Sequence, residues 1–517
     1  MQLTRSLTRA RRIAPDRVAM IYGERRATWT EVEARVARLA GALRRLGAGV
    51  EDRVIILGHS SDRFLESLYA TLWAGGISAP LSTRATSDEL DYLFGDLDAK
   101  LFIVGDGFEQ EAARWRAANA GAPVIYMGDG ATPAGFLDYE ALLRDSAPIA
   151  DACRHGDDIA AIFYTGGTTG RPKGVMLTHT NLNSNALNGI FHLRQQEGIV
   201  NLHAGPLYHV AAASRIFTAS LLAGTHVVIP RFTPEAVFDA IARHRVTLVS
   251  MVPTMMSLLV HHPDLTKHDL SSLKMMTYGA SPMPEALIVE LMDKLPHVSF
   301  AQAYGMTELS PACTFLEAQH HTRDPKLAHL LRSAGRPTIC CDIRIVGPDD
   351  AELPLGEIGE IVAAGPIVMK GYWRQPEASA EALRGGYMHT GDLGYMDAQG
   401  FVFVVDRLKD VIVSGGENVS SIEVENAISL HPSVRSCAVI GVPHELWGEA
   451  VHAEVVLKDG ASASEDEIIA FAREKLAHFK TPRTIGFREE MPMSGANKIL
   501  KSELRKPFWQ GRTRAVN

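Results

Sequence analysis

A run of glycines and threonines directly after a strand-like segment constrains this chain more than any other feature. The apolar segment 159–164 is followed by Thr165, Gly166, Gly167, Thr168, Thr169, Gly170, Arg171, Pro172 and Lys173. Such a run places flexible backbone, hydroxyl donors and one cation at the end of a strand, which is what a polyphosphate requires. We therefore predict a phosphate-binding loop over residues 165–173.

This loop departs from the pattern of kinases and motor ATPases. Their loop places Gly-Lys-Ser/Thr at the start of a helix, whereas Arg171 and Pro172 separate Gly170 from Lys173 here. Pro172 also lacks the N–H that a helix interior would use. Taken alone, the loop could equally be a solvated turn between two strands, so the motifs that follow it decide its interpretation.

Five further motifs follow the loop in a fixed order. They are Tyr304-Gly305-Met306-Thr307-Glu308, Thr390-Gly391-Asp392, Asp406-Arg407-Leu408-Lys409-Asp410, Gly415-Gly416-Glu417-Asn418 and Ser494-Gly495-Ala496-Asn497-Lys498. The series resembles the adenylate-forming superfamily of acyl-CoA synthetases, firefly-type luciferases and peptide-synthetase adenylation domains, over nearly the whole chain. The closing segment 492–505 looks most like bacterial fatty-acyl-CoA synthetases. The resemblance implies an enzyme that turns a carboxylic acid and ATP into an acyl-adenylate and pyrophosphate.

Length and patterning predict a two-domain α/β protein. At 517 residues the chain exceeds what one core usually supports. Between about residues 28 and 300, helical segments such as 234–244 alternate with short apolar runs, the pattern of a parallel sheet with crossover helices. Gly/Pro-punctuated strands beyond residue 330 indicate a β subdomain, and a further helix is expected over 464–477. We expect a large N-terminal domain of stacked, mostly parallel sheets over 1–408 and a small mobile C-terminal α+β lid domain over 409–517.

Composition excludes several other classes of protein. The net charge of −8 gives no electrostatic footprint for nucleic acid. Neither a membrane-spanning apolar run nor the apolar core of a secretory signal is present in the sequence. Five scattered cysteines without a Cys-x-x-Cys pair suggest a reducing compartment. We expect a cytoplasmic protein whose partners are small molecules, and we leave peripheral membrane contact and a homodimer open.

The resemblance assigns roles in a nucleotide site. It implies that residues 165–173 hold the β- and γ-phosphates of ATP, that Glu308, beside Thr307, helps to bind Mg²⁺, and that Asp392 and Arg407 hold the ribose. The residues expected to line the adenine-binding site are Gly279, Ala280, Ser281, Gln302, Ala303, Tyr304, Gly305 and Met306. Gly166 stands where the family usually has a serine, so a hydroxyl donor is lost while backbone donors remain, and weaker ATP binding is expected.

The resemblance also assigns roles on the small domain. Lys498 is the expected catalytic cation, because a long charged side chain can neutralise charge developing between the carboxylate and the α-phosphate. The family segment usually ends Thr-Gly-Lys, so the glycine has moved to Gly495 here. Gly415, Gly416, Glu417 and Asn418 resemble the family's loop beside the pantetheine channel of CoA. The domain would turn about Lys409, the hinge position, and present Lys498 and this loop in succession.

The acyl site is expected after residue 206. His209 matches a family position near the acyl carboxylate and the thiol channel. No acidic residue lies between 206 and 217 to hold an amino group, which argues against an amino-acid substrate. The small run 211–214 either leaves room for a chain or ring or packs closely against a neighbour. Arg215 either reaches solvent or faces the pocket, in which case a dicarboxylate such as malonate becomes a candidate.

We predict an ATP- and Mg²⁺-dependent acid:CoA ligase, with a fatty acid favoured over an aryl acid of the cinnamate or benzoate type. A malonate:CoA ligase, an enzyme that passes its acyl group to a carrier protein, and an inactive nucleotide and acyl sensor are the alternatives. A sensor needs affinity without groups that act in the transition state. The joint presence of Lys173, Glu308, Asp392, Arg407 and Lys498 therefore argues against the sensor.

Overall fold

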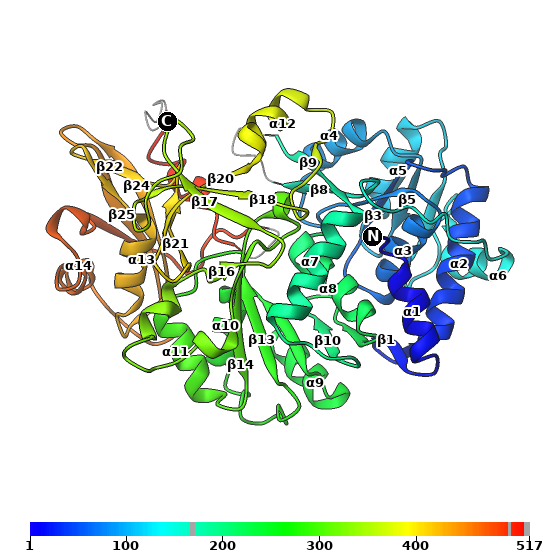
Figure 1. Ribbon diagram of the computed structural model, residues 1–517, viewed down its shortest axis with the longest axis horizontal. Coiled ribbons are helices and arrows are strands. Elements are labelled where there is room, and N and C mark those ends of the chain that lie inside the picture. Colours follow the sequence, from blue (N-terminus) through cyan, green and yellow to red (C-terminus); the bar gives the residue numbers. More distant parts are fainter. Residues whose placement is uncertain (166–170, 495–497, 511–517) are drawn as a thin grey trace.

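The computed structural model describes residues 1–165, 171–494 and 498–510, and it confirms the predicted α/β class. Two large, mostly parallel sheets are stacked with helices between and outside them (Figure 1). Two smaller sheets follow along the chain. The N-terminal segments, in blue, and the C-terminal segments, in orange, lie at opposite ends of the long axis.

The first sheet has the strand order β16-β15-β14-β13-β12-β10-β11-β1-β2. Its pairings are parallel except for β1 with β2 and β15 with both of its neighbours. The strands are β1 (Val18–Tyr22), β2 (Arg25–Thr28), β10 (Val200–His203), β11 (Thr225–Val228), β12 (Leu248–Met251), β13 (Met275–Gly279), β14 (Ser299–Tyr304), β15 (Thr314–Leu316) and β16 (Arg336–Pro337). The carboxyl ends of β10, β12, β13 and β14 therefore meet at one edge of the sheet, where ligands of such folds bind.

The second sheet has the strand order β19-β9-β8-β4-β3-β5-β6-β7. Its pairings are parallel apart from those of β9 with β8 and β19. The strands are β3 (Arg53–Leu57), β4 (Ile77–Pro80), β5 (Leu101–Val104), β6 (Val124–Tyr126), β7 (Leu137–Asp138), β8 (Ile159–Thr165), β9 (Lys173–Thr178) and β19 (Gly371–Tyr372). The predicted phosphate loop thus connects two antiparallel neighbours of this sheet, β8 and β9.

The third and fourth sheets occupy the C-terminal part of the chain. The third contains β17 (Asp342–Val346), β18 (Gly359–Ala364), β20 (Met388–Met396) and β21 (Val402–Arg407). The fourth contains β22 (Ile412–Ser414), β23 (Glu417–Val419), β24 (Val434–His444), β25 (Gly448–Leu457) and β26 (Thr484–Phe487). The chain passes from the third sheet to the fourth over residues 408–411. The proposed domain boundary at 408/409 falls there and stays a prediction.

Helix boundaries follow local capping signals. In α2, Thr28 accepts a hydrogen bond from the Glu31 N–H while the Glu31 carboxylate accepts one from the Thr28 N–H, a capping box. The helices are α1 (Arg5–Ile13), α2 (Trp29–Arg45), α3 (Asp62–Trp73), α4 (Ser87–Leu97), α5 (Glu109–Ala118), α6 (Tyr139–Asp145), α7 (His179–His192), α8 (Val210–Leu221), α9 (Pro234–His244), α10 (Pro253–Val260), α11 (Glu285–Lys294), α12 (Pro376–Ala382), α13 (Ser421–Ser429), α14 (Glu465–Arg473) and α15 (Lys501–Arg505). The prediction for α9 is confirmed, whereas the predicted helix 464–477 ends four residues early, at Arg473. A 3₁₀ turn begins soon after that point.

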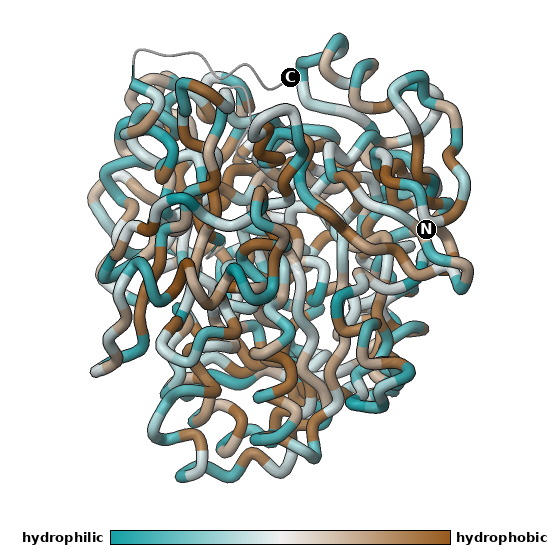
Figure 2. Tube along the Cα trace, turned by 90° about the vertical axis from the view of Figure 1, so that its left-hand side faces the viewer, coloured by the Kyte–Doolittle hydropathy of each residue, from teal (hydrophilic) through white to brown (hydrophobic). Residues whose placement is uncertain are grey.

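The hydrophobic core is divided by the two large sheets. The largest cluster lies between them and includes residues of α2, α3, α7 and α8. A second cluster packs α9, α10 and α11 on the other face of the first sheet, and a third packs α4 and α5 on the other face of the second sheet. Figure 2 shows hydrophobic residues, in brown, running through the interior. No helix in the described part of the chain is long and apolar enough to cross a membrane.

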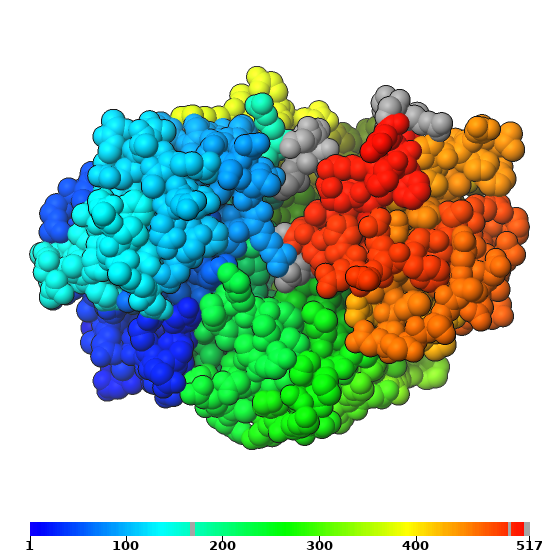
Figure 3. Space-filling model, turned by 180° about the vertical axis from the view of Figure 1, so that it is seen from behind, coloured from blue at the N-terminus to red at the C-terminus, as the bar shows by residue number. Residues whose placement is uncertain are grey.

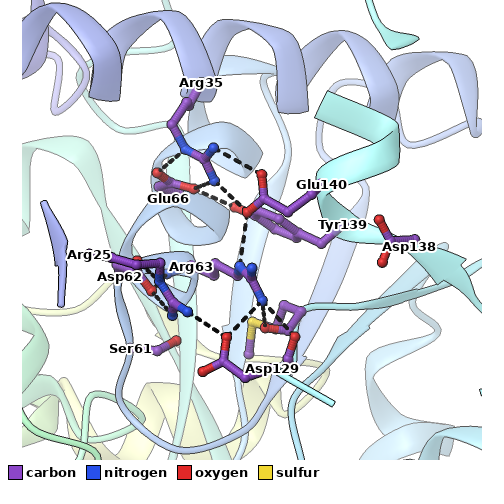
Figure 4. A network of polar contacts seen from close by, with 12 residues as sticks. Arg25, Arg35, Ser61, Asp62, Arg63, Glu66, Asp129, Asp138, Tyr139 and Glu140 are labelled. Atoms are coloured by element: carbon purple, nitrogen blue, oxygen red, sulfur yellow. Dashed lines mark hydrogen bonds and ion pairs between the residues drawn. The ribbon is translucent and has the colours of Figure 1, made fainter. Parts of the chain in front are cut away.

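A network of charged side chains joins α2, α3 and α6 at the N-terminal end of the molecule (Figure 4). Arg35 of α2 contacts both carboxylate oxygens of Glu66 on α3, at 2.6 and 3.0 Å. The Tyr139 hydroxyl donates to the same carboxylate at 2.9 Å. Burial raises the pKa of Glu66, and Arg35 opposes that shift. The carboxylate of Glu66 thus holds three helices together.

We expect Glu66→Ala to destabilise the large sheets and their helices by about 3 kcal/mol, because it leaves Arg35 and the Tyr139 hydroxyl without their acceptor. Urea denaturation followed by circular dichroism measures this change. Glu24→Ala is the matched control, since the Glu24 side chain is 91% exposed in its pair with Arg243. The control should change stability by less than about 0.5 kcal/mol. Equal effects of the two substitutions would contradict this account of the network.

Candidate functional site

The predicted adenine walls lie at the ends of two neighbouring strands. Gly279 ends β13 and Tyr304 ends β14, and Gly279 pairs with Ala303 in register. A Cβ at position 279 would lie 2.1 Å from the Ala303 carbonyl oxygen, so this close approach requires glycine. The turn residues Ala280 and Ser281 follow β13 directly. Gln302 precedes Ala303 on β14, while Gly305 and Met306 follow Tyr304 and lead to the 3₁₀ turn that holds Thr307 and Glu308.

Tyr304, Asp392 and Arg407 form one cluster, although they come from two different sheets. The Tyr304 hydroxyl donates to Asp392 Oδ2 at 2.8 Å. Arg407 Nε lies 3.4 Å from Asp392 Oδ1, across the pairing of β20 with β21. Burial raises the pKa of Asp392, while the positive charges of Arg407 and Lys498 act to lower it. This buried carboxylate can accept hydrogen bonds from neighbouring hydroxyl groups.

Tyr372, which the sequence analysis did not select, contacts both Glu308 and Lys173. The Tyr372 hydroxyl donates to Glu308 Oε1 at 2.9 Å, and Lys173 Nζ lies 4.8 Å from the centre of the Tyr372 ring. Glu308 is only 5% exposed, and burial raises its pKa despite the opposing charges of Lys173 and Arg407. Tyr372 lies on β19, which pairs with β9 just beyond Lys173. No motif marks it, because its role depends on this pairing between distant segments.

Lys498 reaches the same cluster from the C-terminal part of the chain. Its backbone N–H donates to Ser494 Oγ at 3.1 Å, and Arg84 donates to the Ser494 carbonyl at 2.8 Å, which ties this segment to the N-terminal part. Figure 3 shows the red C-terminal segments facing the light-blue segments that contain Arg84. Burial and the charge of Arg407 lower the pKa of Lys498 to about 8, although Asp392 and Glu308 act to raise it. The amine therefore lies within electrostatic range of both carboxylates.

The fit of the site to Mg²⁺ rests on Glu308. Among the described residues, no three His, Cys, Asp or Glu side chains come together as a metal site. Mg²⁺ is often held by one or two carboxylates together with substrate phosphates, so a single buried carboxylate fits that mode of binding. Burial favours the neutral form of Glu308, which a divalent cation would counteract. Glu308 would hold the ion together with nucleotide phosphates.

His209 and the predicted hinge occupy two other places. His209 is the N-cap of α8 and follows β10, so it lies at the same sheet edge as Gly279 and Tyr304. Its ring centre lies 4.7 Å from that of Tyr208. Lys409 lies between Arg407 and Asp410, and burial lowers its pKa. Asp410 accepts a hydrogen bond from Arg505 of α15 at 2.8 Å, which ties the predicted hinge to the C-terminal part.

Two groups of predicted residues are not joined to this cluster. Gly415, Gly416, Glu417 and Asn418 form the exposed turn and second strand of the β22–β23 hairpin, where the Gly415 N–H donates to the Trp447 carbonyl. Among the described residues, no hydrogen bond joins this hairpin to Lys498. Gly166, Gly167, Thr168, Thr169 and Gly170 lie outside the described residues, and the flanking Thr165 and Lys173 face each other across β8 and β9.

Comparison with models of protein families identifies the family of this chain. A model of AMP-binding enzymes matches residues 7–373, and a model of the AMP-binding enzyme C-terminal domain matches residues 423–498. The chain belongs to the AMP-binding enzyme family. This membership confirms the predicted adenylate-forming superfamily.

Two curated proteins and one solved structure are similar to this AMP-binding enzyme over nearly its whole length. A feruloyl-CoA synthase from Amycolatopsis is 41% identical over 97% of this chain and 98% of its own. A long-chain-fatty-acid–CoA ligase from Bacillus subtilis is 32% identical over 95% of this chain and 91% of its own. The crystal structure of ATP-bound MatB from Rhodopseudomonas palustris matches with a TM-score of 0.89 at 33% identity, covering 98% of this chain and 99% of that one.

The prediction of an AMP-forming acyl-CoA synthetase is confirmed at the level of enzyme class by these relatives. The preference for a fatty acid is not confirmed, because the relative with 41% identity is named for an aromatic acid. The roles of individual residues of this AMP-binding enzyme, including Lys498, His209 and the hinge Lys409, stay predictions.

The lowered pKa of Lys498 predicts a pH dependence of adenylation. Its cationic form is lost as the pH rises through about 8 in the free enzyme. Because kcat/KM reports groups of the free enzyme, kcat/KM for pyrophosphate release should decline above about pH 8. In Lys498→Arg the guanidinium keeps its charge, so any remaining activity should lose this decline. A wild-type profile that stays flat up to pH 10 would contradict the assignment.

Proposed function

We propose that this AMP-binding enzyme is an ATP-dependent acid:CoA ligase that acts on an aromatic monocarboxylic acid. It would first join the acid to AMP with release of pyrophosphate, and then transfer the acyl group to the thiol of CoA. The observation that carries the proposal is the position of Lys498, partly buried within electrostatic range of Asp392 and Glu308 and supplied by a segment far along the chain. An aromatic acid replaces the fatty acid favoured from the sequence.

The nucleotide would bind between the two carboxylates. Asp392 would accept hydrogen bonds from the ribose hydroxyls, and Arg407 Nε, 3.4 Å away, would keep that carboxylate ionised. Tyr304, fixed by its hydrogen bond to Asp392, would offer its ring to the adenine. Lys173 would contact the phosphates, and Mg²⁺ bound at Glu308 would neutralise part of their charge.

Lys498 would act at the reacting atoms. A carboxylate oxygen of the substrate attacks the α-phosphorus of ATP, and the bond to pyrophosphate breaks. Both reactants are anionic, so negative charge accumulates where they meet. The ammonium group of Lys498 is already held in this partly desolvated cluster. It would therefore stabilise that charge without reorganisation of solvent. The substrate carboxylate would therefore lie between Lys498 and His209.

Transfer to CoA needs a second arrangement of the C-terminal part. In the present arrangement Lys498 lies within electrostatic range of Asp392 and Glu308, whereas the hairpin of Gly415 and Asn418 is exposed. A turn about Lys409 would withdraw the lysine and bring the hairpin to the site. This motion would account for both half-reactions.

The preference for an aromatic acid is supported by sequence identity and by residue size. Identity to the feruloyl-CoA synthase exceeds that to the long-chain-fatty-acid–CoA ligase by nine percentage points, at 41% against 32%. Ala212, Gly279 and Ala303 are small and only partly buried at the sheet edge that bears His209. Such residues suit a flat ring between α8 and the ends of the strands.

Pyrophosphate release and mass spectrometry of the thioester test this proposal directly. We expect cinnamate-type acids to give acyl-AMP without CoA and acyl-CoA with it, at a kcat/KM at least about tenfold above that of decanoate, which corresponds to about 1.4 kcal/mol of transition-state binding. Adenylation without transfer to CoA would instead favour a carrier protein as the acceptor. Preference for decanoate would restore the fatty-acid prediction and overturn the aromatic one.

A further inference from the structure

Asp406 is a buried carboxylate next to the pair formed by Asp392 and Arg407. It precedes Arg407 on β21, and its neighbour in register is Leu393, which follows Asp392 on β20. Successive side chains of a strand point to opposite faces, so Asp406 points away from the cluster that Arg407 joins. Asp406 is only 1% exposed. The end of β21 therefore carries one side chain for the cluster and one for a second contact.

This second contact crosses the predicted hinge at Lys409 and reaches α13, beside β21 in Figure 1. Asp406 accepts hydrogen bonds from the Ser421 N–H at 2.5 Å and from Ser421 Oγ at 3.1 Å, at the start of the helix. The Val405 carbonyl accepts another from Ser420 Oγ at 2.6 Å. The backbone donors and the dipole at a helix N-terminus favour a carboxylate there. Because β21 precedes the hinge and α13 follows it, a turn about Lys409 would break these contacts.

Lys501 extends the contact to the segment that carries Lys498. Its Nζ donates to Ser421 Oγ at 2.7 Å and lies 2.7 Å from Glu425 Oε1. Burial raises the pKa of Asp406, and the charge of Lys501 opposes that shift. Lys498 lies three residues before Lys501 in the chain. The hydrogen bonds from Asp406 through Ser421 to Lys501 therefore tie the Lys498 segment to the end of β21.

The charges around this contact are distributed so that it can open. Lys501, Ser421 and Glu425 all follow the hinge, so they would move together and the amine would keep a carboxylate partner. Asp406 would stay at the end of β21, where water can hydrate it. Breaking a buried ion pair is usually costly because one charge stays buried without a partner. Here that penalty is avoided, which distinguishes the contact from a permanent structural pair.

We propose that Asp406 is a positioning residue for adenylation, because its contact with α13 holds the C-terminal part in the arrangement that brings Lys498 to Asp392 and Glu308. This inference rests on the proposed function, since it requires two half-reactions with different arrangements. Asp406 touches no reacting atom and acts through Lys498. Loss of the contact shifts the population away from the adenylating arrangement and leaves the arrangement for transfer accessible.

The first test measures the two half-reactions separately in Asp406→Ala. Pyrophosphate release from ATP and the aromatic acid should fall by about 10- to 100-fold, the range of hydrogen bonds to a charged group. Formation of acyl-CoA from supplied acyl-AMP should be unchanged or faster. Ser421→Ala keeps the backbone donor, so it should show the same division with a smaller loss. Asp459→Ala, at an aspartate with a 97% exposed side chain beyond the hinge, is the control and should change neither rate.

Trypsin gives a second readout that needs no substrate. Release of the C-terminal part should expose the connection that contains Arg407 and Lys409. Asp406→Ala should therefore be cleaved after these two residues at least about tenfold faster than wild type, since cleavage follows the population of the open form. Cleavage after Lys458 and Lys475, which lie within the C-terminal part, should keep its wild-type rate because that part stays folded.

Three results would overturn the inference. The first is an equal loss of both half-reactions in Asp406→Ala, the second is a variant that adenylates and is cleaved like wild type, and the third is faster cleavage at all four trypsin sites alike. Ser421→Ala decides in the same way if Asp406→Ala does not fold. A wild type that forms acyl-AMP but no acyl-CoA would refute the proposed function instead, and the cleavage rates would still decide the role of Asp406.

Discussion

Lys498 holds a positive charge in a partly buried cluster that contains two carboxylates, Asp392 and Glu308, and a second cation, Arg407, whose side chain is half exposed. Burial disfavours the charges of Lys498, Asp392 and Glu308, and the attraction between opposite charges compensates only in part. ATP and a carboxylic acid would compensate the charges of the two cations, because both ligands are negatively charged. Mg²⁺ would compensate the negative charge of Glu308. This distribution of charge fits the proposed reaction between two anions.

The rest of the fold serves to bring these charges together from distant segments. The first sheet supplies Tyr304 and the turn with Glu308, the second supplies Lys173 and Tyr372, and the third supplies Asp392 and Arg407. Lys498 comes from the C-terminal part, which joins the remainder through residues 408–411. A charge carried by a separable part can be withdrawn once adenylation is complete, and the same connection would then allow transfer to CoA.

The sequence predicted some residues of this cluster and did not predict others. Lys173, Glu308, Asp392 and Lys498 were predicted because each belongs to a short motif that resembles one of the adenylate-forming superfamily, and the structure brings them into one cluster. Tyr372 was not identifiable, since its contact with Glu308 depends on the pairing of β19 with β9. Arg215 stood out as a charge in an apolar segment, but only helix packing decides which way it points. The substrate class stays a prediction for the same reason, because it depends on how the acyl pocket is lined rather than on a short motif.

The most direct measurement separates the two half-reactions in Lys498→Ala. Pyrophosphate release from ATP and the aromatic acid should fall by about 10²- to 10³-fold, the loss typical of one removed electrostatic stabiliser. Formation of acyl-CoA from supplied acyl-AMP should stay within a few-fold of wild type, because the lysine is then withdrawn. Unchanged pyrophosphate release, or an equal loss in both half-reactions, would contradict the role of Lys498 in this account.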